Sequence, residues 1–186
     1  MGRLRSVPRR VSLLHPNPGI ARSSEPFDHP GPMRMGMPPG DEILTHRLIL
    51  PRDANQHGTL YAGVLLSLAL EAAYATAYRA AGLSANLVLK RVLDLRCHEP
   101  VRIGQVVEIR GREVHRARAQ VVVALYGTPL PDRSSPWLDA MMQFVQVGDS
   151  GRPEALEGEA NAPPADLLPP WLALRDRAIR LLAIRS

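Results

Sequence analysis

The alternation of apolar and polar positions divides the chain into strand-like and helix-like segments. Between residues 41 and 50, apolar residues separated by polar ones predict a first strand. Residues 61–81 are rich in Ala and Leu, hold no Pro and are followed by Gly82, which predicts one long helix with a glycine stop. β-branched and alternating runs then predict four more strands, at residues 86–97, 106–115, 117–127 and 137–147.

This order of elements predicts an α+β fold. A strand, a long helix and four strands with short links favour an antiparallel sheet with the helix packed on one face. Because the helix is apolar around most of its circumference, we expect it to be buried on nearly all sides. The sheet is therefore expected to wrap around the helix.

The segments outside this core have the composition of appendages. Residues 1–40 are rich in Pro, Gly and Arg without a helical or strand period, which predicts a disordered basic tail. Residues 41–150 form the predicted domain, and the Gly-, Pro- and Glu-rich residues 151–170 form a linker. Residues 171–186 predict a basic amphipathic helix, which favours docking on the body or on a partner subunit over binding a membrane surface.

The tail leaves three interpretations open. Met1, Gly2 and Ser6 match a loose myristoylation pattern, and the first 24 residues are rich in Arg and free of acids, as in an organellar transit peptide. Both patterns are easily matched by unrelated sequences. A translation start at one of the methionines 33, 35 and 37 would make the upstream residues a passive tail, and we favour this interpretation.

Charge and composition narrow the classes of partner. The net charge is +5, but six arginines against two acids lie in the first 40 residues, which leaves 17 basic and 16 acidic residues elsewhere. A nearly neutral body with few aromatic residues argues against nucleic-acid binding. The single Cys97 cannot form an internal disulfide, which favours a reducing cytoplasmic compartment. The six histidines lack metal-ligand spacing and no apolar run reaches the ~20 residues of a membrane span, so we expect neither a metal site nor a membrane partner.

The long helix carries a polar stripe on an otherwise apolar surface. Its members recur at helical spacing and so share one face: Ser67, Glu71, Tyr74 and Tyr78. A carboxylate in such a helix needs a polar neighbour. Glu71 is therefore either a reactive group or part of a subunit interface, where it would pair with Arg79 or a tyrosine hydroxyl.

Three linked stretches of the sequence resemble one known family. They read "LTHRLILPRDANQHGTLYAGVLLSLALEAA", "EPVRIGQVVEIRGREV" and "MMQFVQVGDSGRP", and the similarity covers about residues 42–156. In this order they are similar to the hotdog-fold acyl-CoA thioesterases of the cytosolic, broad-specificity type. The resemblance implies a hotdog fold, in which a five-stranded antiparallel sheet wraps a long central helix. It also implies homodimers that often assemble into hexamers, with the active site at the dimer interface.

The resemblance assigns roles to residues near the start of the long helix. Thioester hydrolysis needs a polarised carbonyl and a water delivered to its carbon. Backbone N–H groups around Gly63 would bind the oxyanion, although Tyr61 and Ala62 replace the residues that the family usually places there. Asn55, in the loop before the helix, would orient the water, and Asp53 of the same loop is expected to bond backbone amides rather than to react.

The position of the base is the point at which this sequence departs from the family. The acid that the family carries on its helix falls on Leu70, and Glu71 follows one position later. One residue turns a helical side chain by about 100 degrees, which changes the direction in which it points. We therefore expect either Glu71 or the loop residue His57 to act as the base.

The predicted function is hydrolysis of acyl-CoA thioesters to free acid and coenzyme A. Three strand arginines are candidates for the phosphates of coenzyme A: Arg91, Arg116 and Arg118. No cofactor is expected, because coenzyme A is part of the substrate. The alternative is a catalytically degenerate hotdog protein that binds acyl-CoA or another apolar ligand, or forms an oligomeric scaffold. Leu70 favours this alternative, whereas Asn55 and Gly63 favour the enzyme.

Overall fold

A computed structural model describes residues 42–82, 84–131, 135–156 and 167–184 of the 186 residues. The predicted tail of residues 1–40 and the middle of the predicted linker lie outside the described residues. All the described residues belong to one compact unit.

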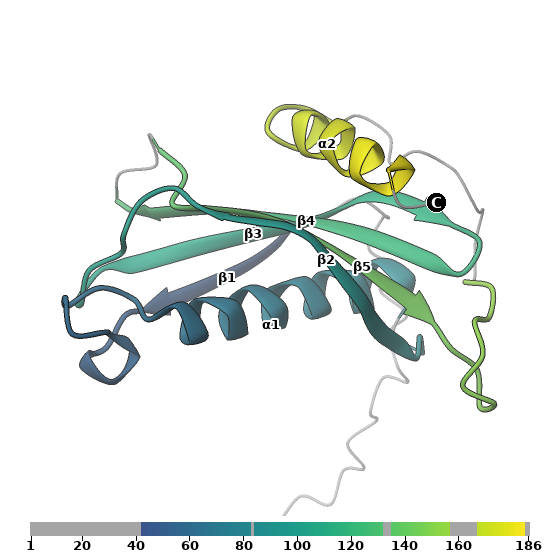
Figure 1. The fold of residues 1–186 in the computed structure, drawn as a ribbon, viewed down its shortest axis with the longest axis horizontal. Helices are drawn as coiled ribbons and strands as arrows, with labels where there is room; N and C mark the ends of the chain where they lie inside the picture. Colours follow the sequence, from purple (N-terminus) through teal and green to yellow (C-terminus); the bar gives the residue numbers. More distant parts are fainter. Residues whose placement is uncertain (1–41, 83, 132–134, 157–166, 185–186) are drawn as a thin grey trace, which may run out of the picture. The chain divides into compact units, whose positions relative to one another are not determined.

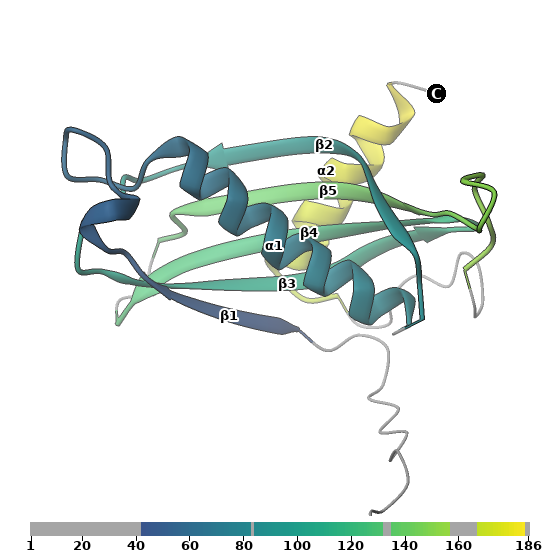
Figure 2. The ribbon, with the colours of Figure 1, turned by 90° about the horizontal axis from the view of Figure 1, so that it is seen from below.

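The five strands form one antiparallel sheet in the order β1-β3-β4-β5-β2. Figure 2 shows this order, with β1 and β2 at the two edges. The prediction of an α+β fold with a five-stranded antiparallel sheet is confirmed. The strands are β1 (Ile43–Leu48), β2 (Leu87–Cys97), β3 (Val106–Ala117), β4 (Gln120–Leu130) and β5 (Leu138–Gln146).

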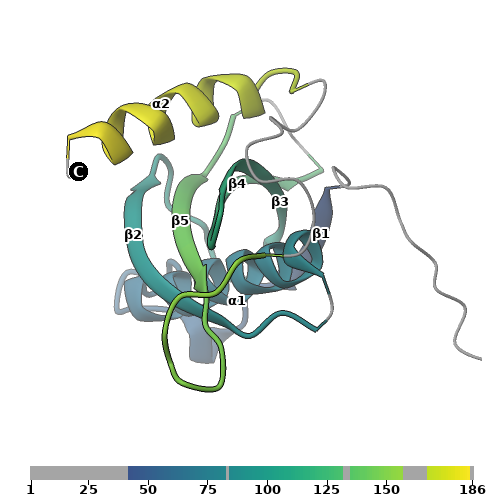
Figure 3. The same cartoon turned by 90° about the vertical axis from the view of Figure 1, so that its right-hand side faces the viewer.

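The long helix α1 (Ala62–Ala81) packs on one face of the sheet, and the strands curl around it (Figure 3). Its inner face is built from small residues, among them the fully buried Ala69, Ala73 and Ala77. Small side chains let the helix lie close to the strands, which supply the bulk of the core. The contact is tightest at Gly111 of β3, where an added Cβ would lie 2.0 Å from the Thr76 hydroxyl oxygen.

The outer face of α1 is not covered by the described part of the chain. Leu66, Leu70 and Tyr74 are 51%, 39% and 43% exposed, so the expectation of burial on nearly all sides is wrong for a single chain. The sheet is too narrow to enclose the helix completely, and an apolar helix face is left open. Within the described ranges, no helix is long and apolar enough to cross a membrane.

A second helix, α2 (Trp171–Ala183), covers the opposite face of the sheet (Figure 1). Trp171, Leu174 and Ala178 are buried there in a second, smaller apolar core with sheet residues such as Met141. The Trp171 indole donates a hydrogen bond of 2.6 Å to a carboxylate oxygen of Glu42. The apolar stripe predicted for this helix therefore docks on the body of the protein.

Several strand ends differ from the sequence prediction by up to about three residues, and the end of β4 is the most informative of them. The strand predicted at residues 117–127 continues to Leu130, with Thr128 opposite Glu108 and Pro129 opposite Val107. Pairing of β4 with β5 ends at Gly127. Because the β5 side of the strand is unpaired beyond that point, Pro129 can continue the strand without removing a hydrogen bond from that side.

Candidate functional site

The loop between β1 and α1 is held in shape by Asp53. A short 3-10 helix, η1 (Pro51–Asp53), follows β1 and buries the Asp53 side chain. The carboxylate accepts a 3.0 Å hydrogen bond from the Leu50 amide and lies 3.4 Å from the Arg47 guanidinium. The Leu50 hydrogen bond and, beyond it, the Arg47 charge lower the pKa of Asp53. As expected from the sequence, Asp53 bonds the loop backbone, and it stays ionised to do so.

Asn55 organises the turn that follows. Its Oδ1 accepts hydrogen bonds from the backbone N–H groups of His57 at 2.9 Å and Thr59 at 3.3 Å, while Nδ2 lies 3.1 Å from the Thr59 hydroxyl. Gly58, at φ +71°, closes the turn. An amide nitrogen carries two protons, so one N–H of Asn55 can serve the loop and the second can serve a water or substrate. The His57 side chain is exposed at the tip of the same turn.

The first turn of α1 presents backbone amides that have no acceptor within the helix. The Leu65 N–H bonds the Tyr61 carbonyl at 3.0 Å, so the N–H groups of residues 62–64, the free amides of α1, precede the first intrahelical bond. Ala62 is the first helical residue, and its substitution for glycine is therefore compatible with the backbone. At Gly63 an added Cβ would lie 2.5 Å from the Tyr61 ring, so a larger residue there requires this exposed ring to turn aside.

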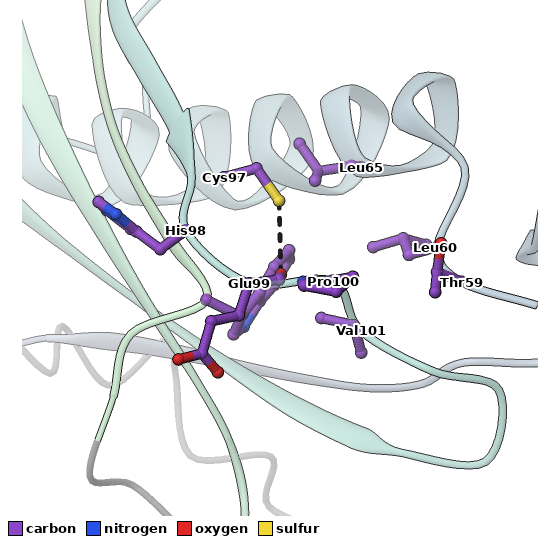
Figure 4. Close-up of a pocket in the computed structure, with 9 residues that line it drawn as sticks. Thr59, Leu60, Leu65, Cys97, His98, Glu99, Pro100 and Val101 are labelled. Atoms are coloured by element: carbon purple, nitrogen blue, oxygen red, sulfur yellow. Dashed lines mark hydrogen bonds between the residues drawn. The ribbon is translucent and has the colours of Figure 1, made fainter. Parts of the chain in front are cut away.

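A cavity of about 260 Å³ connects this loop to the end of β2 (Figure 4). The Cys97 thiol in its wall donates a 3.5 Å hydrogen bond to the Glu99 carbonyl, and burial raises the pKa of that thiol, which disfavours the nucleophilic thiolate. The ring of His98 points away from Cys97 in Figure 4 and bonds Asp139 at 2.6 Å. The cavity is lined by Thr59, Leu60, Leu65, Cys97, His98, Glu99, Pro100, Val101 and Trp137.

A larger groove of about 590 Å³ lies between α1 and β2. Leu70 and Glu71 both line it, so the residue one position after the expected acid borders the same space. The Glu71 carboxylate has no hydrogen bond or ion pair with any described residue, so its predicted pairing with Arg79 or a tyrosine is not formed there. The other lining residues are almost all apolar: Tyr74, Ala75, Leu87, Val88, Leu89 and Phe144.

The two candidate regions are separated within one chain. Gly63 and Glu71 are eight residues apart on α1, which corresponds to about 12 Å along the helix axis. Asn55 and His57 lie in the loop before the helix, which is joined to the helix start by a 2.8 Å hydrogen bond from the Tyr61 amide to the Asp53 carbonyl, and Glu71 lies farther along. The structure thus brings together the loop and the free amides, but it does not bring Glu71 to them.

The three arginines do not converge on the loop. Arg91 donates a 2.7 Å hydrogen bond to Gln143, and Arg116 pairs with Glu113 at 2.7 Å and donates to the Ala80 carbonyl at the far end of α1. Arg118 is exposed in the turn between β3 and β4. Arg91 and Arg116 therefore have structural partners in the single chain.

The sequence interpretation missed Thr59 and the cavity that it helps to line. Thr59 stands four residues after Asn55, a spacing at which a hydroxyl can bond an Asn side chain, and this was the available signal. No signal in the sequence indicated that Cys97, His98 and Glu99 also line this cavity, because their place in it depends on where the end of β2 meets the loop.

Comparison with known proteins relates this region to one superfamily. The model of the Thioesterase superfamily matches residues 57–126, which include the end of the loop, all of α1, β2, β3 and the first part of β4. This region is similar to the thioesterase superfamily. The hotdog fold that the sequence resemblance implied is confirmed, since the five-stranded antiparallel sheet with its long helix matches the solved structures of acyl-CoA hydrolases.

Several solved hotdog structures are similar to this chain. An acyl-CoA hydrolase from Staphylococcus aureus, in complex with butyryl coenzyme A, is 20% identical with a TM-score of 0.64, over 77% of this chain and 83% of that one. An acyl-CoA hydrolase from Bacillus cereus is 18% identical with a TM-score of 0.67, over 77% and 85%. A hexameric thioesterase from Yersinia pestis is 23% identical with a TM-score of 0.58, over 66% and 100%. No curated protein sequence matches the chain.

Proposed function

We propose that the protein hydrolyses acyl-CoA thioesters to a free acid and coenzyme A, at a site formed by two copies of the chain. The observation that carries the proposal is Glu71, an exposed residue that lines an apolar groove beside Leu70 and whose carboxylate has no partner among the described residues. An apolar groove with one carboxylate suits an acyl chain whose thioester is attacked by water. The thioesterase-superfamily match of residues 57–126 supports the same chemistry.

The need for two copies follows from the geometry of the single chain. A base, a water and an oxyanion donor must all lie within about 3–3.5 Å of the reacting group, whereas Glu71 and Gly63 are about 12 Å apart along α1. β2 is an edge strand, and its two ends lie in different regions: Leu87 in the groove and Cys97 in the cavity beside the loop. Antiparallel pairing of β2 with the same strand of a second copy would place the loop of one chain beside the groove of the other.

The exposed apolar residues support this arrangement. Val88 and Val92 of β2 are 48% and 42% exposed, next to the open face of α1 with Leu66 and Leu70. A monomeric globular protein rarely leaves such a continuous apolar surface uncovered. A homodimer through this surface is the proposed state, and assembly of dimers into a hexamer is the larger state that the sequence resemblance implies.

The proposed reaction assigns a step to each region. The thioester carbonyl accepts hydrogen bonds from the free amides around Gly63, where the helix dipole also stabilises a developing negative charge. Glu71 of the other copy removes a proton from a water that the second Asn55 N–H orients, and the water oxygen bonds to the carbonyl carbon. Collapse of the tetrahedral intermediate breaks the carbon–sulfur bond, and the coenzyme A thiolate leaves and takes up a proton. His57 is the second candidate base.

The substrate and setting complete the proposal. Arg91, Arg116 and Arg118 keep their predicted role toward the phosphates of coenzyme A, and of these three Arg118 has an exposed side chain. The reaction uses no cofactor. A cytoplasmic setting is proposed from the single Cys97, which has no partner cysteine in the chain.

A second candidate function is binding of acyl-CoA without turnover. It is favoured by Leu70, which places an apolar side chain where the family carries its acid, and by Asn55, whose amide oxygen is already used by the loop. In that case the groove would hold the acyl chain and no group would activate water.

Release of coenzyme A from butyryl-, octanoyl- and palmitoyl-CoA separates the two functions. We expect turnover by the parent, a loss of about 10²–10⁴-fold in Glu71→Gln through the missing base, and a smaller loss in Asn55→Ala. Asp176→Asn, which neutralises an exposed carboxylate on α2, is the matched control and should keep parental turnover. Binding of an acyl-CoA thioether without any release of coenzyme A would support the second candidate, and absence of both would contradict the two functions together.

A further inference from the structure

An aromatic wall lines part of the groove: Tyr74 and Phe144 belong to its lining, and Tyr78 supports Tyr74. The Tyr74 ring meets Phe144 of β5 edge-on, with centroids 5.9 Å apart, and stacks on Tyr78 at 6.2 Å and 13°. Phe144 is fully buried in the core, so it provides a fixed support. Tyr74 is thus held from two sides although 43% of it is exposed.

The wall has a defined place along α1. The helix contributes Leu70 and Glu71 to the groove and then, one turn later, Tyr74 and Ala75, where its contribution ends. Tyr78 stands one turn beyond and backs Tyr74. An acyl chain that runs from Glu71 toward the C-terminus of α1 would meet the Tyr74 ring three residues, or ~4.5 Å along the helix axis, farther on.

We propose that Tyr74 determines the length of acyl chain that the groove accepts. The proposal rests on the proposed function only for the identity of the ligand as an acyl-CoA. The surrounding groove residues are aliphatic, among them Leu70, Leu87 and Leu89, and they suit a straight aliphatic chain. A chain that reaches past Tyr74 must displace a ring fixed by two aromatic contacts or turn out into water, and both reduce the gain from burying its last methylenes.

Three variants test the proposal in both directions. Tyr74→Ala removes the wall up to Tyr78, Tyr74→Phe keeps the ring without the hydroxyl, and Ala75→Phe adds a ring beside the wall. For each, kcat/KM is measured with butyryl-, octanoyl-, lauroyl- and palmitoyl-CoA, and Kd is measured with thioether analogues of the same four chains. Far-UV circular dichroism and thermal unfolding check that each variant is folded.

The ratio of long-chain to short-chain values is the readout. We expect Tyr74→Ala to raise the palmitoyl-to-butyryl ratio by about tenfold or more, since single methylenes in an apolar pocket change selectivity by ~10–200-fold. Ala75→Phe should lower the ratio, and Tyr74→Phe should keep the parental ratio whatever its absolute rate. A parental ratio in folded Tyr74→Ala would overturn the proposal.

Failure of this proposal can be told apart from failure of the proposed function. If the parent hydrolyses acyl-CoA but Tyr74→Ala keeps the parental chain-length profile, Tyr74 has no such role and the hydrolase assignment stands. If the parent releases no coenzyme A while the Kd values shift as expected, Tyr74 sets chain length in a binding protein. A parent that binds none of the four thioethers contradicts the role of Tyr74 as well as the function.

Discussion

Two neighbouring side chains of α1, Leu70 and Glu71, determine where a carboxylate can enter the groove. They are adjacent in sequence and about 100 degrees apart around the helix, yet both line the groove between α1 and β2. The groove is wide enough to receive side chains from both positions. Glu71 is therefore a candidate base despite its displaced position, and Leu70 contributes apolar surface where the family carries an acid.

This geometry predicts that an acid at position 70 can replace Glu71. We expect Glu71→Gln to lose most turnover. The double variant Leu70→Asp with Glu71→Gln should turn over at least about tenfold faster than Glu71→Gln alone, since a correctly placed base contributes about 10²–10⁴-fold. Leu70 is 39% exposed, so a carboxylate there can stay ionised. Initial rates of coenzyme A release measure the effect. A folded double variant that stays as slow as Glu71→Gln would show that position 70 does not reach the reacting carbon.

The packing of helix α1 on strand β3 depends on one glycine. Gly111 is buried opposite Thr76, whose hydroxyl donates a 2.7 Å hydrogen bond to the Ala72 carbonyl one turn earlier. An added methyl would lie 2.0 Å from that hydroxyl oxygen, and neither the helix backbone nor the strand can move away without disturbing the core.

We therefore expect Gly111→Ala to lower the free energy of unfolding by about 1–3 kcal/mol through overpacking. Thr76→Ala removes the clashing oxygen, so the double variant should be more stable than the sum of the two single changes predicts, by at least ~0.5 kcal/mol. Urea denaturation followed by circular dichroism gives the free energy of unfolding of the parent, of the two single variants and of the double variant. Simple additivity would mean that the helix shifts away from the strand at no cost.

The docking of α2 makes the stability of the fold depend on pH. His115 of β3 is half-buried beneath α2, and burial, with a smaller effect from the positive charge of Arg175, lowers its pKa below the ordinary value of about 6.5. Between the lowered and the ordinary value the unfolded chain binds more protons than the folded one, so stability rises with pH across this window. Asp139 adds an effect at lower pH: burial opposes its ionisation, but Arg177 and His98 outweigh burial and lower its pKa.

Stability is therefore expected to fall as the pH drops from about 7 to 5 because of His115, and to fall again below about pH 4 as Asp139 takes up a proton. His115→Gln cannot be protonated, so its thermal unfolding midpoint should change less than that of the parent between pH 7 and 5. Differential scanning calorimetry across this range measures both. Equal shifts in parent and variant would assign the pH dependence to other groups.

The uncovered apolar faces of α1 and β2 form the surface of the proposed homodimer. Val92 lies at the middle of the 11-residue β2 and is 42% exposed, so a two-fold axis through the strand centre would bring it near its own copy. We expect Val92→Glu to place two like charges together and to produce a folded monomer with little turnover. Analytical ultracentrifugation and coenzyme A release measure the two effects. A Val92→Glu dimer with full activity would exclude this edge as the interface.

Much of the architecture could be predicted because its causes are local. The alanine-rich run that ends at Gly82 and the alternating runs after it indicate the type and order of elements, and the predicted strand ends agree with the structure within about three residues. The end of β4 was missed because Pro129 normally stops a strand, and only the absence of a neighbour on one side lets it continue. The uncovered face of α1 was missed because an apolar helix surface does not reveal whether its own chain or another one covers it.

Hydrophobic period, turn chemistry and motif spacing were sufficient to predict the sheet, the central helix and the loop that contains Asn55. They were also sufficient to place Gly63 and Glu71 on the central helix. The folded chain was needed to show that Leu70 and Glu71 share one groove, that Tyr74 packs against Phe144 in its wall, and that Arg116 binds the end of α1. The physical reason is that contacts between side chains far apart in the sequence depend on how the helix is rotated on the sheet and on which of its faces the strands leave open.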